Sequence, residues 1–253
     1  MAYWSVNLLI IFSLCVLLAG VLIPQILLIA YRKNLFDEVD ERKIHKGSIP
    51  RLGGLAFEPV IMLSLALVLG ANMMMGYSDF GTALTHDCLL LIATFCSMMM
   101  LYLIGIADDL IGIKYRAKFV VQIACAVLLI CGGAWFDSLG GIFGIWGLHP
   151  AIGYPFTAIV IVFLINAINL IDGIDGLASG LSSIAVIIFG ISFFILGEYA
   201  LSAISFAALG VLCPFFYYNV FGNVQKHSKI FMGDTGSLTI GLILCILGIK
   251  LFT

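Results

Sequence analysis

Long apolar runs separated by short polar breaks constrain the fold of this 253-residue chain more than any other feature. Hydrophobic residues make up 62% of the sequence, charged residues only 10%, and the mean hydropathy is +1.18. A helix needs roughly 20 apolar residues to cross a bilayer, so the runs predict about eight spanning helices. We therefore expect an all-α, polytopic transmembrane bundle that forms a single domain over residues 1–253. The expected helices cover residues 4–31, 55–76, 88–107, 117–135, 154–170, 177–196, 200–218 and 236–252.

Composition also excludes several classes of protein. The net charge of −2 is small and says nothing about nucleic acid, but the sequence has no basic run interleaved with aromatic residues, so we expect no nucleic-acid partner. The seven cysteines lie almost entirely in apolar runs and form no C-x-x-C motif, which is typical of small hydrophobic core residues. The first apolar run lacks a basic start and is too long for a signal peptide, so we expect it to be a retained helix.

Lysine and arginine residues gather in one of two alternating sets of polar breaks. Every one of the twelve except Lys250 lies in this set or at the adjoining helix ends. Basic residues are retained on the cytoplasmic side of a membrane, so the asymmetry predicts a cytoplasmic location for this set and an outside N-terminus. The set comprises residues 32–54, 108–116, 171–176 and 219–235.

Three polar clusters lie on this predicted cytoplasmic side, and the first is the pair Asp108 and Asp109 at the end of the third apolar run. A helix C-terminus disfavours carboxylates unless a cation compensates them. The pair is therefore either a solvated helix end neutralised by Lys114, Arg116 or Lys118, or a functional pair. In the second case it works with a divalent metal, or one member accepts a proton.

The second cluster places an oxygen-bearing side chain at every third position. Its members are Asn166, Asn169, Asp172 and Asp175. On a continuous helix they would share one face, although Gly173 and Gly176 make a helix doubtful beyond Leu170. The stripe could coordinate a hard cation and bind a nucleotide. Alternatively, the asparagines bridge helices inside the bundle.

The third cluster opens the last helix, where Asp234 precedes Gly236 and Ser237. Asp234 is either an N-cap that accepts a backbone N–H from one of these two residues, or a metal ligand beside a helix N-terminus that favours phosphate. Both roles can coexist. The basic loop over residues 37–54 either sets topology and contacts lipid headgroups, or folds over the carboxylates as a clamp for phosphates.

The three clusters and the basic loop lie in four sequence motifs. They read ERKIHKGSIPRLGG from Glu41, DDLIGIKYRAKF from Asp108, NAINLIDGIDGLASG from Asn166 and KIFMGDTGSLTIG from Lys229. In this order, the motifs resemble those of the polyprenyl-phosphate N-acetylhexosamine-1-phosphate transferases (glycosyltransferase family 4). The IPRLGG loop is closer to the N-acetylglucosamine-1-phosphate branch than to the peptidoglycan translocase, whose loop usually reads TPTMGG.

The resemblance implies transfer of a sugar 1-phosphate from a UDP-sugar, UDP-N-acetylglucosamine in the favoured reading, to a membrane polyprenyl phosphate. UMP is released and Mg²⁺, or alternatively Mn²⁺, is required. Carried across by motif, Asn169 and Asp234 are the metal ligands, and Asp108 or Asp109 accepts a proton from the acceptor phosphate or orients it. The other implied substrate contacts are Asn166, Asp172, Asp175, Lys46 and Lys118, with Asp175 at the uracil edge. The resemblance further implies a bacterial inner-membrane protein with a cytoplasmic site, and family members often form homodimers.

Family members usually continue for two or three more helices and a loop with a histidine-rich motif, whereas this sequence ends at Thr253. The resemblance therefore implies a chain truncated at its C-terminus. Three alternatives stay open: the peptidoglycan reaction with a UDP-N-acetylmuramoyl-pentapeptide donor, a non-catalytic fragment, and an ion-coupled transporter. A transporter predicts carboxylates near the middle of the membrane.

Overall fold

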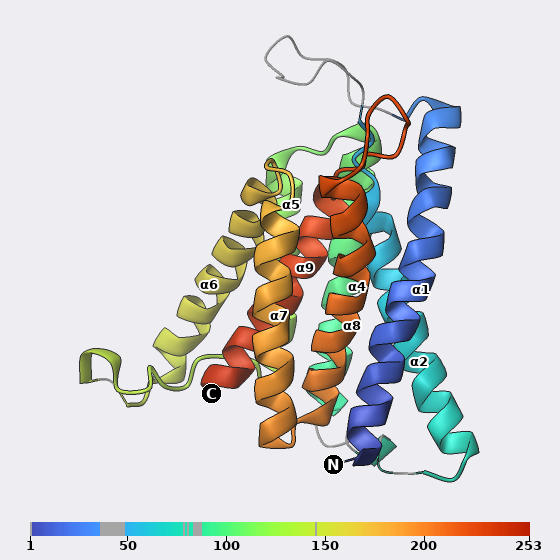
Figure 1. Cartoon of the computed structure of the whole chain (residues 1–253). Helices are drawn as coiled ribbons and strands as arrows, with labels where there is room; N and C mark the ends of the chain where they lie inside the picture. Colours follow the sequence, from blue (N-terminus) through green and yellow to red (C-terminus); the bar gives the residue numbers. More distant parts are fainter. Residues whose placement is uncertain (1, 36–48, 78, 80, 83–87, 145) are drawn as a thin grey trace.

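The computed structural model describes residues 2–35, 49–77, 79, 81–82, 88–144 and 146–253. Within these ranges the chain forms a bundle of eight labelled α-helices without strands (Figure 1). Seven of the helical segments described are long and apolar enough to cross a membrane, and α5 is shorter at 17 residues. The prediction of an all-α polytopic bundle is confirmed. The helices are α1 (Ala2–Lys33), α2 (Phe57–Met74), α4 (Cys88–Ile111), α5 (Tyr115–Cys131), α6 (Pro150–Ile171), α7 (Leu177–Leu196), α8 (Tyr199–Val220) and α9 (Gly233–Phe252).

The boundaries of two helices differ from prediction where the carboxylates lie. Helix α4 continues to Ile111, so Asp108 and Asp109 lie within its last turns, and the predicted end at residue 107 was wrong. Helix α9 begins at Gly233, three residues before the predicted start, which places Asp234 inside its first turn. In both cases the polar residues stay helical because neighbouring helices supply partners for their side chains, which sequence periodicity cannot show.

Helix α9 is the central helix of the bundle. Every residue from Thr235 to Leu247 is buried, and α4 and α6 pack most extensively against it, with α7 alongside. A helix that is apolar on all sides requires such an enclosed position. The enclosure fixes the position of Asp234, the second residue of α9.

A short 3₁₀ helix, η1 (Gly53–Ala56), holds the chain before α2 against the start of α9. The backbone N–H groups of Gly53 and Gly54 donate to the carbonyls of Phe231 and Met232, at 2.9 and 2.8 Å. A Cβ atom on Gly54 would lie only 2.0 Å from the backbone nitrogen of Gly236, so this contact requires glycine. The IPRLGG segment is thereby packed against the start of α9, the helix that carries Asp234.

The helix ends that carry the three acidic clusters share one end of the bundle. Figure 1 shows the end of α6 and the start of α9 at the top, and the N-terminus of α1 at the bottom. This agrees with the predicted alternation of the polar breaks. The side of the membrane that this end faces stays a prediction from the charge asymmetry.

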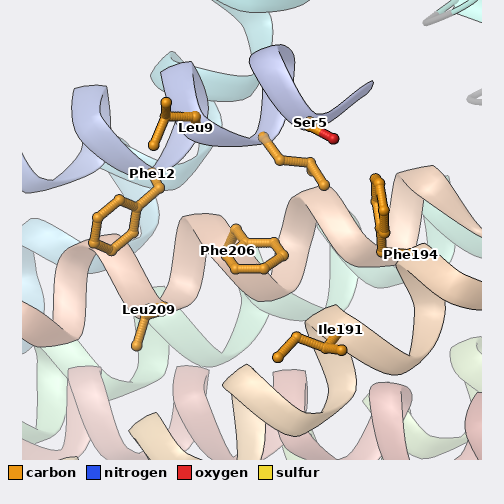
Figure 2. A pocket seen from close by; sticks show the side chains of 8 residues that line it. Ser5, Leu9, Phe12, Ile191, Phe194, Phe206 and Leu209 are labelled. Carbon is orange, nitrogen blue, oxygen red and sulfur yellow. The ribbon is translucent and has the colours of Figure 1, made fainter. Parts of the chain in front are cut away.

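An apolar cavity of about 300 Å³ lies between α1, α7 and α8 near the N-terminus of α1 (Figure 2). Apart from Ser5, its lining side chains are all apolar. Figure 2 shows Phe12, Phe194 and Phe206 around the hollow. The cavity lies toward the end of the bundle opposite the acidic clusters and offers no charged group for chemistry.

Candidate active site

Lys118 joins two of the acidic clusters. Its ammonium lies 3.1 Å from Oδ2 of Asp108 and 2.6 Å from Oδ2 of Asp234, so α5 provides a cation between carboxylates of α4 and α9. All three side chains are about one-fifth exposed. Asp108 also accepts a hydrogen bond from the backbone N–H of Ile113 at 2.7 Å, where the chain leaves α4. The structure thus brings together the first and third clusters across more than a hundred residues of sequence.

Asp109 caps the N-terminus of α9 from the neighbouring helix. Its two carboxylate oxygens accept hydrogen bonds from the backbone N–H groups of Asp234 and Thr235, at 2.8 and 2.9 Å. Oδ2 also accepts the Thr235 hydroxyl at 2.6 Å. The first N–H groups of a helix lack partners within the helix, and they favour negative charge. Gly233 makes this approach possible because its φ is +76° and a Cβ there would lie 2.7 Å from Asp109 Oδ2.

Asp234 is not the N-cap that the sequence suggested as one of its roles. Met232 occupies that position, and the expected hydrogen bond to Asp234 from the backbone of Gly236 or Ser237 is replaced by the contacts of Asp109. Oδ1 of Asp234 instead accepts the Asn169 amide at 3.1 Å, and Oδ2 accepts Lys118. The side chain points across to α5 and α6, because partners there hold both of its oxygens.

Asn169 is the link between α6 and α9. Its amide nitrogen donates both to Asp234 and to the hydroxyl of Ser237, at 3.1 and 2.8 Å. Both acceptors lie on the first turns of α9. Asn169 therefore joins the second cluster to the third.

Asp172 caps the end of α6 and lies half-buried among the other carboxylates. Burial, together with the neighbouring charges of Asp109 and Asp234, raises its pKa to about 8. The backbone N–H of Gly233 and the charge of Arg51 act in the opposite direction. Asp172 is therefore a carboxyl group that holds its proton near neutral pH in the free protein.

Asp175 lies beyond the end of α6 and forms an ion pair with Lys229. The buried Asn219 joins the same two loops: it accepts the N–H of Gly176 at 2.7 Å and donates to the carbonyl of Ile230 at 2.9 Å. The loop after α6 is thus fastened to the loop before α9. The doubt about a helix beyond Leu170 was justified, since α6 ends at Ile171.

One of the residues predicted to contact substrate, Asn166, has its hydrogen-bond partners outside this arrangement. Asn166 exchanges hydrogen bonds with Gln122 of α5, at 2.7 and 3.4 Å, and donates to the carbonyl of Val162. These contacts match the alternative that the asparagine bridges helices. Lys46 lies outside the described residues.

Sequence reasoning missed Lys229, Thr235 and Asn219 as members of the site region, and it also missed the buried acidic residue Glu58. Glu58, in the first turn of α2, is 1% exposed, and neither carboxylate oxygen has a hydrogen-bond partner in the described part of the chain. An acidic residue inside the apolar run LAFEPV was the available signal. Lys229 and Thr235 flank Asp234 in the fourth motif, but only tertiary contacts reveal their partners.

The donor set fits a hard divalent cation. The carboxylate of Asp234 and the amide of Asn169 meet at one point, and an ammonium already lies against the carboxylates there. Among the described residues, no group of three or more His, Cys, Asp and Glu residues could hold a metal without further ligands. Mg²⁺ is commonly bound by one or two carboxylates together with substrate phosphates and water, which this arrangement allows.

The chain matches the family described as Glycosyl transferase family 4 over residues 91–252. It is 32% identical over 215 residues to the undecaprenyl-phosphate alpha-N-acetylglucosaminyl 1-phosphate transferase of Salmonella typhi, covering 84% of this chain and 54% of that protein. It is 30% identical over 240 residues to a probable undecaprenyl-phosphate N-acetylglucosaminyl 1-phosphate transferase of Bacillus subtilis (strain 168), covering 94% and 61%.

A third relative is the phospho-N-acetylmuramoyl-pentapeptide-transferase of Staphylococcus carnosus, 30% identical over 255 residues, which cover 95% of this chain and 74% of that protein. The fold and the comparisons together define a multi-pass membrane protein. The chain belongs to glycosyl transferase family 4, and the family predicted from the four motifs is confirmed. It spans about half the length, 54%, of the Salmonella relative.

Proposed function

We propose that this protein transfers a sugar 1-phosphate, with N-acetylglucosamine 1-phosphate as the favoured group, from a UDP-sugar to a membrane polyprenyl phosphate. An oxygen of the acceptor phosphate attacks the β-phosphorus of the donor. The bond from this phosphorus to the bridging oxygen breaks, and UMP leaves with that oxygen. The observation that carries the proposal is Lys118 between Asp108 and Asp234, beside Asn169, at one end of a membrane bundle.

The position of this cluster suits the two substrates. The donor is soluble in water and the acceptor phosphate lies at the membrane surface, so a site at the helix ends is accessible to both. Two polyanions must approach one another, and the repulsion between them has to be offset by positive charge. Lys118 supplies one such charge within the cluster.

Asp234 and Asn169 would hold the Mg²⁺ ion. When bound, this ion supplies compensation for the charge of the pyrophosphate and of the departing UMP. Asp109 holds Asp234 in place through the start of α9. Asp108, whose carboxylate faces Lys118, is then the member of the pair that orients the acceptor phosphate or accepts its proton. Manganese is the alternative ion.

Asp172 and Asp175 would bind the nucleotide at the loop after α6, with Asp175 at the uracil edge. The charge asymmetry supports a cytoplasmic position for this end of the bundle in a bacterial inner membrane. It stays a prediction that Lys46 and Asn166 contact the substrate. The formation of a homodimer also stays a prediction. The single transmembrane domain over residues 1–253 is likewise part of the proposal.

A UDP-N-acetylmuramoyl-pentapeptide donor is the second candidate, supported by the likeness to the Staphylococcus carnosus transferase. The IPRLGG loop favours the first donor. The clustering of Asp108, Asp109 and Asp234 at helix ends argues against an ion-coupled transporter, which would place carboxylates nearer to the bilayer midplane.

The test uses the purified protein with polyprenyl phosphate, Mg²⁺ and either of the two donors carrying a radiolabel, and measures label in the lipid fraction. We expect labelled lipid from UDP-N-acetylglucosamine, and a loss of roughly 100-fold or more in Asp234→Asn, because charge stabilisation at the metal is removed. Asp137→Asn is the matched control, since Asp137 is an exposed carboxylate in the loop between α5 and α6, away from the site.

Absence of labelled lipid from both donors with folded protein would contradict the proposal for these 253 residues. Full activity in the Asp109→Asn, Asp234→Asn double variant would contradict the assignment of the site. Label from the pentapeptide donor alone would establish the second candidate in place of the first.

A further inference from the structure

The ion pair between Lys229 and Asp175 connects the two loops on which the nucleotide would lie. Lys229 is 9% exposed as a residue, while about one-third of the Asp175 side chain is exposed. A buried ammonium requires a partner, and within the described residues Asp175 is the one that pairs with Lys229. Lys229 is therefore buried, whereas its partner Asp175 remains partly accessible to solvent.

The backbone around this pair is also fixed. Asn219 holds the N–H of Gly176, the residue after Asp175, and the carbonyl of Ile230, the residue after Lys229. Gly176 has a φ of +74°, and a Cβ there would lie 2.7 Å from Cγ2 of Val220. Both partners of the ion pair are therefore held in position by their neighbours as well as by each other.

Lys229 engages Oδ2 of Asp175, and no hydrogen bond reaches Oδ1 within the part of the chain that the structure describes. A carboxylate paired with an ammonium offers acceptors only, and its free oxygen can bind a ligand that donates. Asp175 is thus a half-exposed hydrogen-bond acceptor whose orientation depends on Lys229.

We infer that Lys229 is a specificity-determining positioning residue, which holds Asp175 as a one-sided acceptor for the N3–H group of a uracil ring. This rests on the proposed function, in which Asp175 lies at the base of the nucleotide. Cytosine carries a lone pair at ring position 3, where uracil carries N3–H. The fixed carboxylate therefore favours a uridine nucleotide over a cytidine nucleotide with the same sugar and phosphate.

Removal of the lysine changes this selectivity in a predictable direction. In Lys229→Met the carboxylate loses its partner and can rotate away. Its oxygen is then no longer held toward ring position 3, so the hydrogen bond that distinguishes uracil from cytosine weakens. Loss of a positive charge also weakens phosphate binding, but it does so equally for UMP and CMP, so the ratio of their affinities isolates the effect on the base.

The experiment measures the dissociation constants of UMP and CMP for the purified protein in the presence of Mg²⁺. A hydrogen bond to a charged group contributes enough to give the wild type a preference for UMP of at least about tenfold. We expect the ratio to fall toward one in Lys229→Met and in Asp175→Asn. The double variant should fall no further, because the two residues act as a unit. Lys229→Arg should restore the preference.

Lys226→Met is the matched control, because Lys226 carries the same charge on the same loop but is exposed. It should keep the wild-type ratio. An unchanged ratio in Lys229→Met, or a wild type that binds CMP as tightly as UMP, would overturn the inference while leaving the proposed transfer reaction standing. A folded wild type that binds neither nucleotide would overturn both.

Discussion

Asp109 accepts both the backbone N–H and the side-chain hydroxyl of Thr235, at 2.9 and 2.6 Å. The carboxylate on α4 therefore caps the helix that carries Asp234. Within the pair Asp108 and Asp109, Asp109 is thus the member that organises the start of α9. The other member, Asp108, faces the cation Lys118. Two adjacent aspartates thus have separate structural partners.

This division predicts different effects on stability. Asp109→Asn should destabilise the protein by roughly 1–3 kcal/mol, because an amide nitrogen cannot accept the N–H groups at the start of α9. Thermal unfolding of the purified protein measures the effect. Thr235→Val, which removes only the hydroxyl, is the control and should cost less. Equal melting temperatures for Asp109→Asn and the wild type would show that the cap contributes nothing.

Replacement of Lys118 should make stability depend on divalent cations. In Lys118→Met, the carboxylates of Asp108 and Asp234 lose their shared ammonium, and we expect a loss of roughly 1–3 kcal/mol without metal. Mg²⁺ can then compensate the uncovered charges, so it should raise the melting temperature of the variant more than that of the wild type.

The control for this effect is Arg116→Met, because Arg116 is exposed on the same helix and contacts Tyr115 instead of a carboxylate. It should respond to Mg²⁺ as the wild type does. If Mg²⁺ raised the melting temperature of Lys118→Met no more than that of the wild type, the Lys118 ammonium would not occupy a position suited to a metal.

The raised pKa of Asp172 predicts a pH-dependent stability in protein freed of metal with a chelator. The folded protein holds the Asp172 proton up to about pH 8, whereas the unfolded chain releases it near its ordinary pKa of 3.8. The folded state therefore loses stability through this group as pH rises between these values. Asp172→Asn stays neutral, so its melting temperature relative to the wild type should rise progressively from pH 5 to pH 8. A difference that is constant over this range would contradict the raised pKa.

Gly54→Ala tests the contact between η1 and α9. A Cβ at this position would lie 2.0 Å from the nitrogen of Gly236, so the helices must move apart, at a cost of about 1–3 kcal/mol or more. Gly70→Ala is the matched control, because Gly70 lies on α2 and, beyond the backbone of its own helix turn, no atom lies within 4 Å of the added carbon. That substitution should stabilise the helix by about 0.5–1 kcal/mol. Similar melting temperatures for the two variants would rule out a tight contact at Gly54.

Hydrophobic periodicity and charge asymmetry predicted the bundle because the membrane imposes them locally, residue by residue. A membrane-spanning helix must be apolar over its whole length. For α7, the apolar run predicted residues 177–196, and the helix has these limits in the structure. The same reasoning misplaced the end of α4 and the start of α9. Helix ends beside polar residues depend on partners that come from other helices, such as Asp109 for α9.

The sequence by itself determined the class of fold, the alternation of polar breaks and, through four ordered motifs, the family. These properties follow from composition and from short stretches of chain. Only the tertiary structure decided which carboxylate faces Lys118, which one caps α9, and that Asn166 binds Gln122 while Asn169 reaches Asp234. The physical reason is that each of these choices depends on a hydrogen bond or ion pair between helices, and such partners are far apart in the sequence.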